Sequence, residues 1–114
     1  MKAIVKKKGF SAACNVANSI LSRARGLMFS SLHWNEGLLF VFPEEEIVDI
    51  HMLFVFFPLD VVWLNKKGKI VQIKRNVKPF MPFIAGEKAT YLLEMKAGNT
   101  SALRMGDTLD IINL

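Results

Sequence analysis

Strict alternation of apolar and polar residues over short runs is the feature of this sequence that most limits its fold. Tyr91, Leu93 and Met95 fall on one side of such a run. Glu94 and Lys96 fall on the opposite side. A period of two is typical of a half-buried strand, so the chain is predicted to be mainly β. The same alternation recurs over residues 69–75 and 108–111.

Two segments, residues 38–42 and 58–64, are apolar almost throughout and are predicted to be central strands. The second segment is followed by Asn65-Lys66-Lys67-Gly68 and then by the alternating run from residue 69. Gly68 can adopt the positive φ that a short hairpin loop needs. Residues 59–64 and 69–75 are therefore predicted to form an antiparallel hairpin.

One short helix is predicted near residues 19–28. Asn18 or Ser19 can cap its start, and Gly26 is expected to end or kink it. Apolar residues at helical spacing predict a single buried face, made of Ile20, Leu21, Ala24, Leu27 and Met28. Many short strands with one helix predict a small antiparallel sandwich or barrel.

The length of 114 residues suits one domain, residues 1–114, and a content of 52% hydrophobic and 22% charged residues argues against disorder. The single cysteine, Cys14, excludes an intramolecular disulfide and is expected to be a structural thiol. The longest apolar run, Met52 to Leu59, is too short to span a bilayer. A soluble, cytoplasmic protein is predicted, and its oligomeric state is left open.

The net charge of +5 is distributed in blocks along the chain. Residues 1–35 and 61–86 each carry six Lys or Arg and no acid, whereas residues 36–60 carry six acids and no Lys or Arg. Pairing of opposite charges between neighbouring elements is the preferred interpretation. The alternative is a nucleic-acid or acidic-partner surface in segment 66–78, through Lys66, Lys67, Lys69, Lys74, Arg75 and Lys78.

Aromatic residues gather in two stretches, Phe54 to Phe57 and Phe80 to Phe83. Packing in the core, or a loop covering the open end of a sandwich, is the preferred interpretation. With the basic segment nearby, the same aromatics could instead stack on single-stranded nucleic acid.

Metal and nucleotide motifs are missing from the sequence. His33, His51 and Cys14 are the only residues of their types, and they form neither HxxxH nor CxxC spacing. The sequence also lacks GxGxxG and Walker loops. No metal and no cofactor are therefore predicted.

Arg25 and Asp60 are charged residues at the edges of apolar segments. Arg25 lies beside the apolar face of the predicted helix, and Asp60 begins an apolar strand. The preferred interpretation is an ion pair that joins helix to sheet, with Asp60 or Asp107 as the partner of Arg25. The alternative is that Arg25 holds an anionic ligand.

His51 lies between Ile50 and Met52. Asp49, two residues earlier, lies on the same strand face as His51 if the segment is extended. A histidine in such surroundings is more often a hydrogen-bonded core or rim residue. It could instead act as a general acid or base.

The order of several motifs resembles the family known as domain of unknown function 192. The resemblance covers residues 9–112 and includes Arg25-Gly26-Leu27-Met28, Pro58-Leu59-Asp60, Leu93-Glu94-Met95-Lys96-Ala97-Gly98 and Gly106-Asp107. It implies an all-β, jelly-roll-like sandwich with a small helix. It implies no established activity and no catalytic residues. Many relatives have an aromatic residue where this chain has His51, and many carry a secretion signal.

Three functions follow as hypotheses. The leading one is a binding module for a small polar or anionic ligand, held at the mouth of the sandwich by Arg25, His51 and Asp60. The second is binding of nucleic acid or an acidic partner through segment 66–78. The third is an enzyme in which His51 acts with Asp49 or Asp60 as acid and base.

Overall fold

A computed structural model of the protein describes residues 2–114. Seven strands form one curled sheet in the order β5-β4-β6-β3-β2-β1-β7. Neighbouring strands are antiparallel except β2 and β3, which run parallel. The elements are β1 (Lys2–Lys7), β2 (Phe10–Ala17), α1 (Ile20–Arg25), β3 (Glu36–Ile47), β4 (Leu59–Leu64), β5 (Ile70–Val77), β6 (Lys88–Lys96) and β7 (Asp110–Ile112). The predicted mainly-β fold with one short helix is confirmed.

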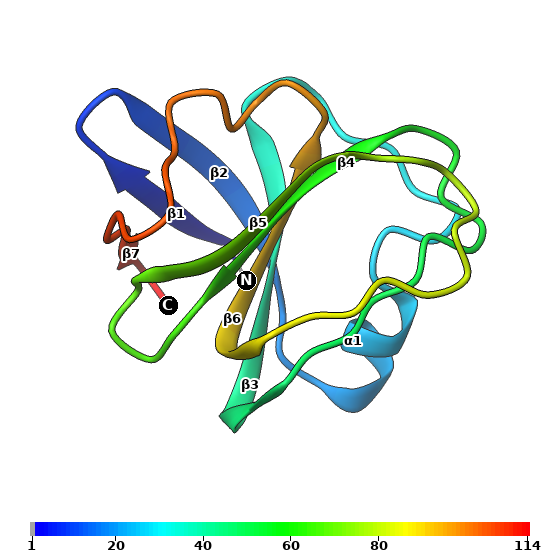
Figure 1. The fold of residues 1–114 in the computed structure, drawn as a ribbon, viewed down its shortest axis with the longest axis horizontal. Coiled ribbons are helices and arrows are strands. Elements are labelled where there is room, and N and C mark those ends of the chain that lie inside the picture. The colour runs from blue at the N-terminus through cyan, green and yellow to red at the C-terminus, as the bar shows by residue number, and fades with distance from the viewer. Residues whose placement is uncertain (1) are drawn as a thin grey trace.

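The two ends of the sheet are joined by the chain segment that leads into β7, which gives a half-barrel (Figure 1). Lys69 forms an isolated antiparallel bridge with Thr108. The N–H of Ile70 donates to the Asp107 carbonyl at 2.8 Å, and the N–H of Leu109 donates to the Gly68 carbonyl at 2.8 Å. These bonds pair the start of edge strand β5 with the residues just before β7, so part of the β5 edge is not exposed.

Both faces of the central strands are buried. All six residues of β4 are buried, as predicted for a continuously apolar strand. One core cluster, inside the curl of the sheet, includes Cys14, Leu93 and Met95. A second cluster, on the other face, includes Trp63 and Leu92. Burial raises the pKa of the Cys14 thiol to about 12, against a smaller lowering by Lys2, which fits the expected structural role.

Helix α1 begins as predicted at Ser19, whose hydroxyl accepts the Ser22 N–H at 3.0 Å in a capping box. It ends at Gly26, where φ is +51°. The predicted apolar face is wrong, because Ile20 and Leu21 are 79% and 83% exposed. The helix ends at Gly26, so the residues after it do not continue the predicted helical face. Of the five residues predicted for that face, only Leu27 is buried, in the second cluster.

The predicted hairpin is confirmed by the antiparallel pairing of β4 with β5. Gly68 has a φ of +82°, as the turn requires. A Cβ at this position would lie 2.4 Å from the Leu109 carbonyl oxygen. Glycine is therefore needed both for the turn and for the approach of the segment before β7.

Helix α1 and the long loops lie at the end of the molecule away from β1 and β7 (Figure 1). Among residues 2–114, no helix is long and apolar enough to cross a membrane.

Candidate functional site

A cavity of about 330 Å³ lies between α1 with its following turn, strands β3 and β6, and the chain just after β3. Its walls are largely apolar and include Leu27, Phe40, Val55 and Leu92. Six charged or titratable side chains also line it, namely Arg23, Arg25, Glu46, Asp49, His51 and Glu94. This mixture of an apolar body and a few polar groups is typical of small-molecule sites.

The two arginines of α1 are held differently. The Arg23 guanidinium donates to the Val41 carbonyl at 3.1 Å and lies 5.2 Å from the centre of the Phe42 ring. Its position is therefore fixed against β3. Arg25 makes only one side-chain hydrogen bond in the described chain, to the Ser30 hydroxyl at 3.4 Å. Because a guanidinium has five N–H donors, Arg25 keeps most of them available for a ligand.

The segment that carries Asp49 and His51 is fixed by neighbouring residues. The Trp63 indole N–H donates to the Val48 carbonyl at 2.7 Å. The Gly86 N–H donates to Asp49 Oδ1 at 2.9 Å. A Cβ on Gly86 would lie 1.7 Å from the Val48 carbonyl oxygen, so the close contact depends on glycine.

The His51 ring accepts the Leu53 N–H at its Nδ1, at 3.1 Å. When the ring is neutral, this bond places the proton on Nε2, which makes Nε2 a donor. No hydrogen bond joins His51 to Asp49 within residues 2–114, so the two are not arranged as an acid–base pair.

Glu94 lies in β6 and is only 5% exposed, on the same side of the strand as Leu92. It pairs with Leu38 of β3 and Val61 of β4 across the sheet. Over the described residues its carboxyl group has no side-chain hydrogen-bond partner or ion pair. Burial raises its pKa to about 8, so the carboxyl is mostly protonated at neutral pH.

The alternation of residues 91–96 put Glu94 on the face opposite the core, and this prediction is wrong. Strand β6 lies third in the sheet order, and α1 and the loops cover the face that carries Leu92 and Glu94. A period of two predicts one buried face only when the other meets solvent. Nothing local to residues 91–96 signals that second layer.

Asp60 does not line this cavity. It is buried on β4, where its carboxylate accepts the Asn76 N–H at 2.9 Å, the Gly98 N–H at 3.0 Å and the Thr100 hydroxyl at 2.7 Å. The predicted ion pair of Arg25 with Asp60 or Asp107 does not form. Backbone donors and a hydroxyl already satisfy Asp60, as buried charge requires.

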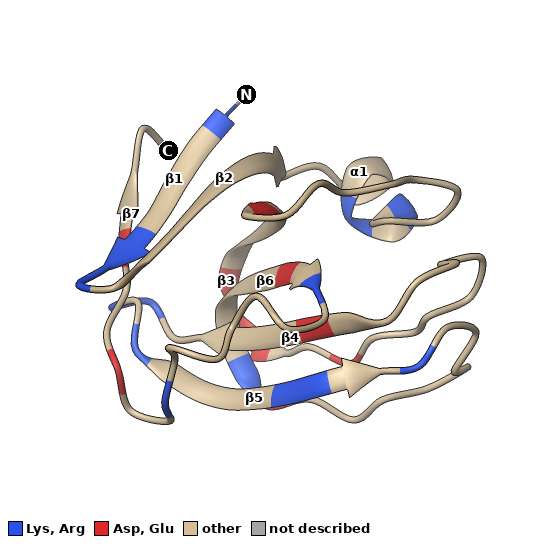
Figure 2. Cartoon of the chain, turned by 90° about the horizontal axis from the view of Figure 1, so that it is seen from above, with Lys and Arg blue, Asp and Glu red and all other residues tan. Residues whose placement is uncertain are grey.

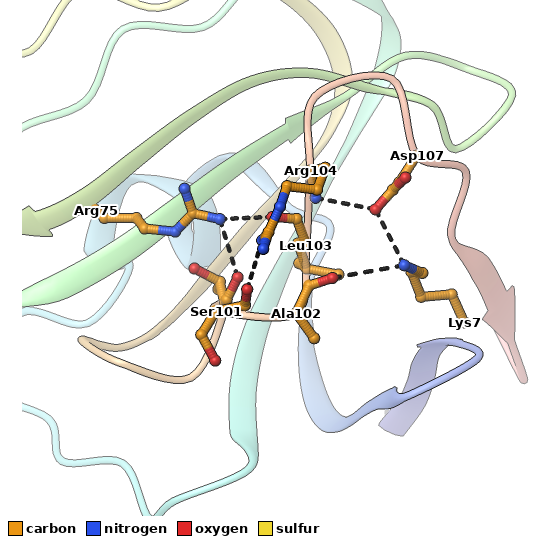
Figure 3. A network of polar contacts seen from close by, with 8 residues as sticks. Lys7, Arg75, Ser101, Ala102, Leu103, Arg104 and Asp107 are labelled. Atoms are coloured by element: carbon orange, nitrogen blue, oxygen red, sulfur yellow. Dashed lines mark hydrogen bonds and ion pairs between the residues drawn. The ribbon is translucent and has the colours of Figure 1, made fainter.

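Asp107 belongs to a network that holds the loop between β6 and β7 (Figure 3). Its carboxylate accepts the Arg104 N–H at 2.9 Å and the Lys7 ammonium at 3.0 Å. These donors, the Arg104 N–H first, hold the pKa of Asp107 below its ordinary value. The Arg75 guanidinium donates to the Leu103 carbonyl at 2.6 Å in the same network.

The six basic residues of segment 66–78 are dispersed. Lys66, Lys67 and Lys69 are exposed at the β4–β5 turn. Arg75 is bound to the loop after β6, and the Lys74 ammonium donates to the Ala85 carbonyl at 3.0 Å. Basic residues also lie on α1 and at the β1–β2 turn, at places on the ribbon that are apart from β5 (Figure 2).

Four phenylalanines from three loops form an exposed cluster, Phe29, Phe54, Phe56 and Phe80. The rings of Phe29 and Phe54 stack at 4.8 Å. Phe29, Phe54 and Phe80 all have positive φ, between +56° and +64°. Packing in the core, one of the two preferred interpretations of the aromatic stretches, is wrong for Phe54, Phe56 and Phe80, which are 44%, 60% and 45% exposed.

The chain is similar in sequence to uncharacterised UPF0127 proteins of Thermococcus and Pyrococcus species. It is 31% identical over 108 residues to a UPF0127 protein of Thermococcus kodakarensis, covering 91% of this chain and 68% of the relative. It is 29% identical over 111 residues to a UPF0127 protein of Pyrococcus furiosus, covering 94% and 93% of the two chains. These names assign no activity.

Two solved structures share the fold. A protein of unknown function from Novosphingobium aromaticivorans superposes with a TM-score of 0.84 at 21% identity, over 96% of this chain and 83% of that one. A protein from Sinorhizobium meliloti, described as "a putative transcription regulator", superposes with a TM-score of 0.87 at 25% identity, over 96% of this chain and 91% of that one. The model of the domain of unknown function 192 family, described as an uncharacterized ACR, matches residues 3–111. The chain therefore belongs to this family, as its motifs indicated.

Proposed function

We propose that this protein binds a small polar ligand with an anionic group in the cavity beside α1. The observation that carries the proposal is the Arg25 guanidinium, which lines a cavity of about 330 Å³ and is paired with no carboxylate in residues 2–114. Pockets of roughly 300–1,000 Å³ are the usual size for small ligands.

The groups around the cavity suit such a ligand. Arg25 offers a planar fork of donors that matches carboxylate or phosphate oxygens. His51 can add a donor from Nε2, since its Nδ1 is taken by the Leu53 N–H. The apolar walls around Phe40 and Leu92 would exclude water from a ligand's carbon skeleton. Asp60 has no part in this proposal, since its acceptors are satisfied elsewhere.

A thermal-shift screen of small anions and sugars tests the proposal. Ligands that bind only the native protein raise its melting temperature. Wild type and Lys66→Ala, which removes a positive charge from the β4–β5 turn, should show equal shifts with an active anion. Arg25→Ala should lose most of the shift. Equal shifts in all three proteins would exclude the Arg25 site.

A second candidate is binding of nucleic acid through the exposed lysines of segment 66–78. It is supported by the net charge of +5 and by the description of the Sinorhizobium meliloti structure. Binding to single-stranded oligonucleotides should weaken steeply as salt rises, and Lys66→Ala with Lys67→Ala should reduce the slope. Arg75 and Lys74 are poor candidates for this contact, because their side chains hold loops. Absent or salt-insensitive binding would contradict this candidate.

A further inference from the structure

Glu94 is a largely buried acid whose carboxyl has no hydrogen-bond or ion-pair partner among residues 2–114. It is 5% exposed, and its carboxyl meets the cavity instead of another side chain. Buried carboxyl groups in native proteins nearly always have hydrogen-bond partners, because desolvation without one is costly. Asp60, the other buried acid of the sheet, has such partners from three residues. The contrast leaves the carboxyl of Glu94 open to a partner that enters the cavity, because its oxygens are not among the sealed, unsatisfied atoms of residues 2–114.

The charged groups around Glu94 come from three parts of the chain. Helix α1 contributes Arg23 and Arg25, and β3 contributes Glu46. The segment after β3 contributes Asp49 and His51. On the neighbouring strands, the residues paired with Glu94 are the apolar Leu38 and Val61.

These neighbours decide which form of the carboxyl faces the ligand. Arg23 is held on the Val41 carbonyl and the Phe42 ring, and no ion pair joins Arg25 to Glu94. Within residues 2–114, no cation is therefore paired with Glu94 to compensate an ionised carboxylate. Burial favours the same neutral form. A neutral carboxyl has an O–H that can donate a hydrogen bond.

We propose that Glu94 in its protonated form donates a hydrogen bond to the ligand, and that the ligand is a small carboxylate with an apolar body. This inference rests on the function proposed above and names the ligand class of the same site. Arg25 from α1 and the Glu94 O–H from β6 then supply donors to one carboxylate. The walls of Phe40, Val55 and Leu92 take up the apolar body.

A planar monoanion fits this set better than a phosphate. One guanidinium fork and one neutral donor match the two oxygens of a carboxylate. A phosphate dianion would bring a second negative charge close to Glu46 and Asp49, which line the same cavity. We therefore expect butyrate and benzoate to bind more tightly than inorganic phosphate.

Calorimetric titration with butyrate and benzoate between pH 6.5 and 9.5 tests the role of Glu94. Wild-type affinity should fall about tenfold from pH 7 to pH 9, as a donor with a pKa of about 8 loses its proton. Glu94→Gln keeps a neutral donor of the same shape, so its affinity should stay within a few-fold of the pH 7 value throughout. Glu94→Leu has no donor and should bind at least tenfold more weakly at pH 7. His51→Asn in the same series shows whether the histidine contributes to the slope.

Proton uptake provides a readout that a purely structural glutamate would not change. Near pH 8, binding of an anion should draw a proton onto Glu94, which titrations in two buffers of different ionisation enthalpy detect. The uptake should vanish in Glu94→Gln. A wild-type affinity that is flat with pH, or a loss of binding in Glu94→Gln, would overturn the inference.

The outcomes separate this inference from the function on which it rests. Arg25-dependent binding that is equal in wild type, Glu94→Gln and Glu94→Leu would leave the binding function standing and refute the role of Glu94. Failure of both carboxylates to bind wild type would refute the ligand class, while the wider anion screen still decides the binding function. Tighter binding of phosphate than of either carboxylate would also refute the ligand class.

Discussion

Asp60 and Glu94 are two buried acids with opposite surroundings, and the difference is one of donors. Asp60 lies where the turn after β6 and the end of β5 direct N–H groups toward it. Glu94 lies near the end of β6 on the face that lines the cavity, and within residues 2–114 no N–H group donates to it. A carboxylate needs donors or cations to remain charged when buried, so the donors around Asp60 keep it ionised, whereas burial favours the neutral form of Glu94.

Removing the Asp60 carboxylate should be strongly destabilising. Asp60→Ala leaves the N–H groups of Asn76 and Gly98 and the Thr100 hydroxyl without their acceptor. We expect a loss of about 3 kcal/mol or more in the free energy of unfolding, measured by urea denaturation. Thr100→Val removes one donor only and should cost about 1 kcal/mol. A loss below that of Thr100→Val would contradict this account.

The same experiment tests the absence of an ion pair between Arg25 and Asp60. If the two side chains do not interact, the stability effects of Arg25→Ala and Asp60→Ala should add in the double variant. A coupling energy well above about 0.5 kcal/mol would mean that they do interact.

Glu94 should make stability depend on pH. Its pKa is raised from 4.5 to about 8, so the native state binds this proton more tightly than the unfolded state. The stabilisation from that proton is complete below pH 4.5 and is lost as pH rises through about 8. Between pH 5 and pH 9 wild type should lose roughly 2–5 kcal/mol relative to Glu94→Gln, as followed by urea denaturation at each pH. Parallel stability curves for the two proteins would show that the Glu94 pKa is not raised.

At the scale of elements, α1 owes its position to Arg23 and to the turn that follows the helix. The helix has six residues and buries none of them. The Arg23 bond to β3 and the buried side chain of Leu27 are the contacts that hold this region on the sheet. An isolated helix of this length is not stable in water, so these contacts maintain it.

Polar substitution on the exposed side of α1 should therefore have little effect. Ile20→Gln and Leu21→Gln should each change the free energy of unfolding by less than about 0.5 kcal/mol, since both side chains are in solvent. Leu27→Ala, the matched control, should cost about 2–4 kcal/mol because that side chain is buried. Chemical denaturation of the three variants gives the comparison. A large loss at Leu21 would mean that a partner covers this side of the helix.

At the scale of the whole molecule, closure of the half-barrel depends on contacts between residues far apart in sequence. The start of β5 meets the residues just before β7, and the Lys7–Asp107 ion pair joins β1 to the same segment. Arg75 donates to carbonyl groups of the loop after β6 (Figure 3). Asp60 accepts the Gly98 N–H from the start of the same loop. These contacts position the loop that leads into β7, which pairs with β1.

Gly68→Ala should test closure. An added Cβ would meet the Leu109 carbonyl at 2.4 Å, so the variant must break the contact or shift the segment. We expect a loss of roughly 2–4 kcal/mol, with faster amide exchange in β7. Gly106→Ala has a similar φ of +88° but open space around the new Cβ, so it should lose only about 1 kcal/mol. Equal losses in the two variants would mean that backbone strain alone, and not closure, is the cause.

The sequence alone determined the strand content, the β4–β5 hairpin, the start and end of α1 and the family. Alternation, a turn glycine and a capping serine act within a few residues, so they can be recognised locally. It also identified Arg25 and His51, which the cavity brings together. Tertiary structure decided the rest. It buried both faces of β6, which turned Glu94 from an expected surface residue into a cavity residue, and it gave Asp60 backbone donors in place of Arg25. Burial and pairing depend on which strands and loops become neighbours, and that is set by contacts across the whole chain.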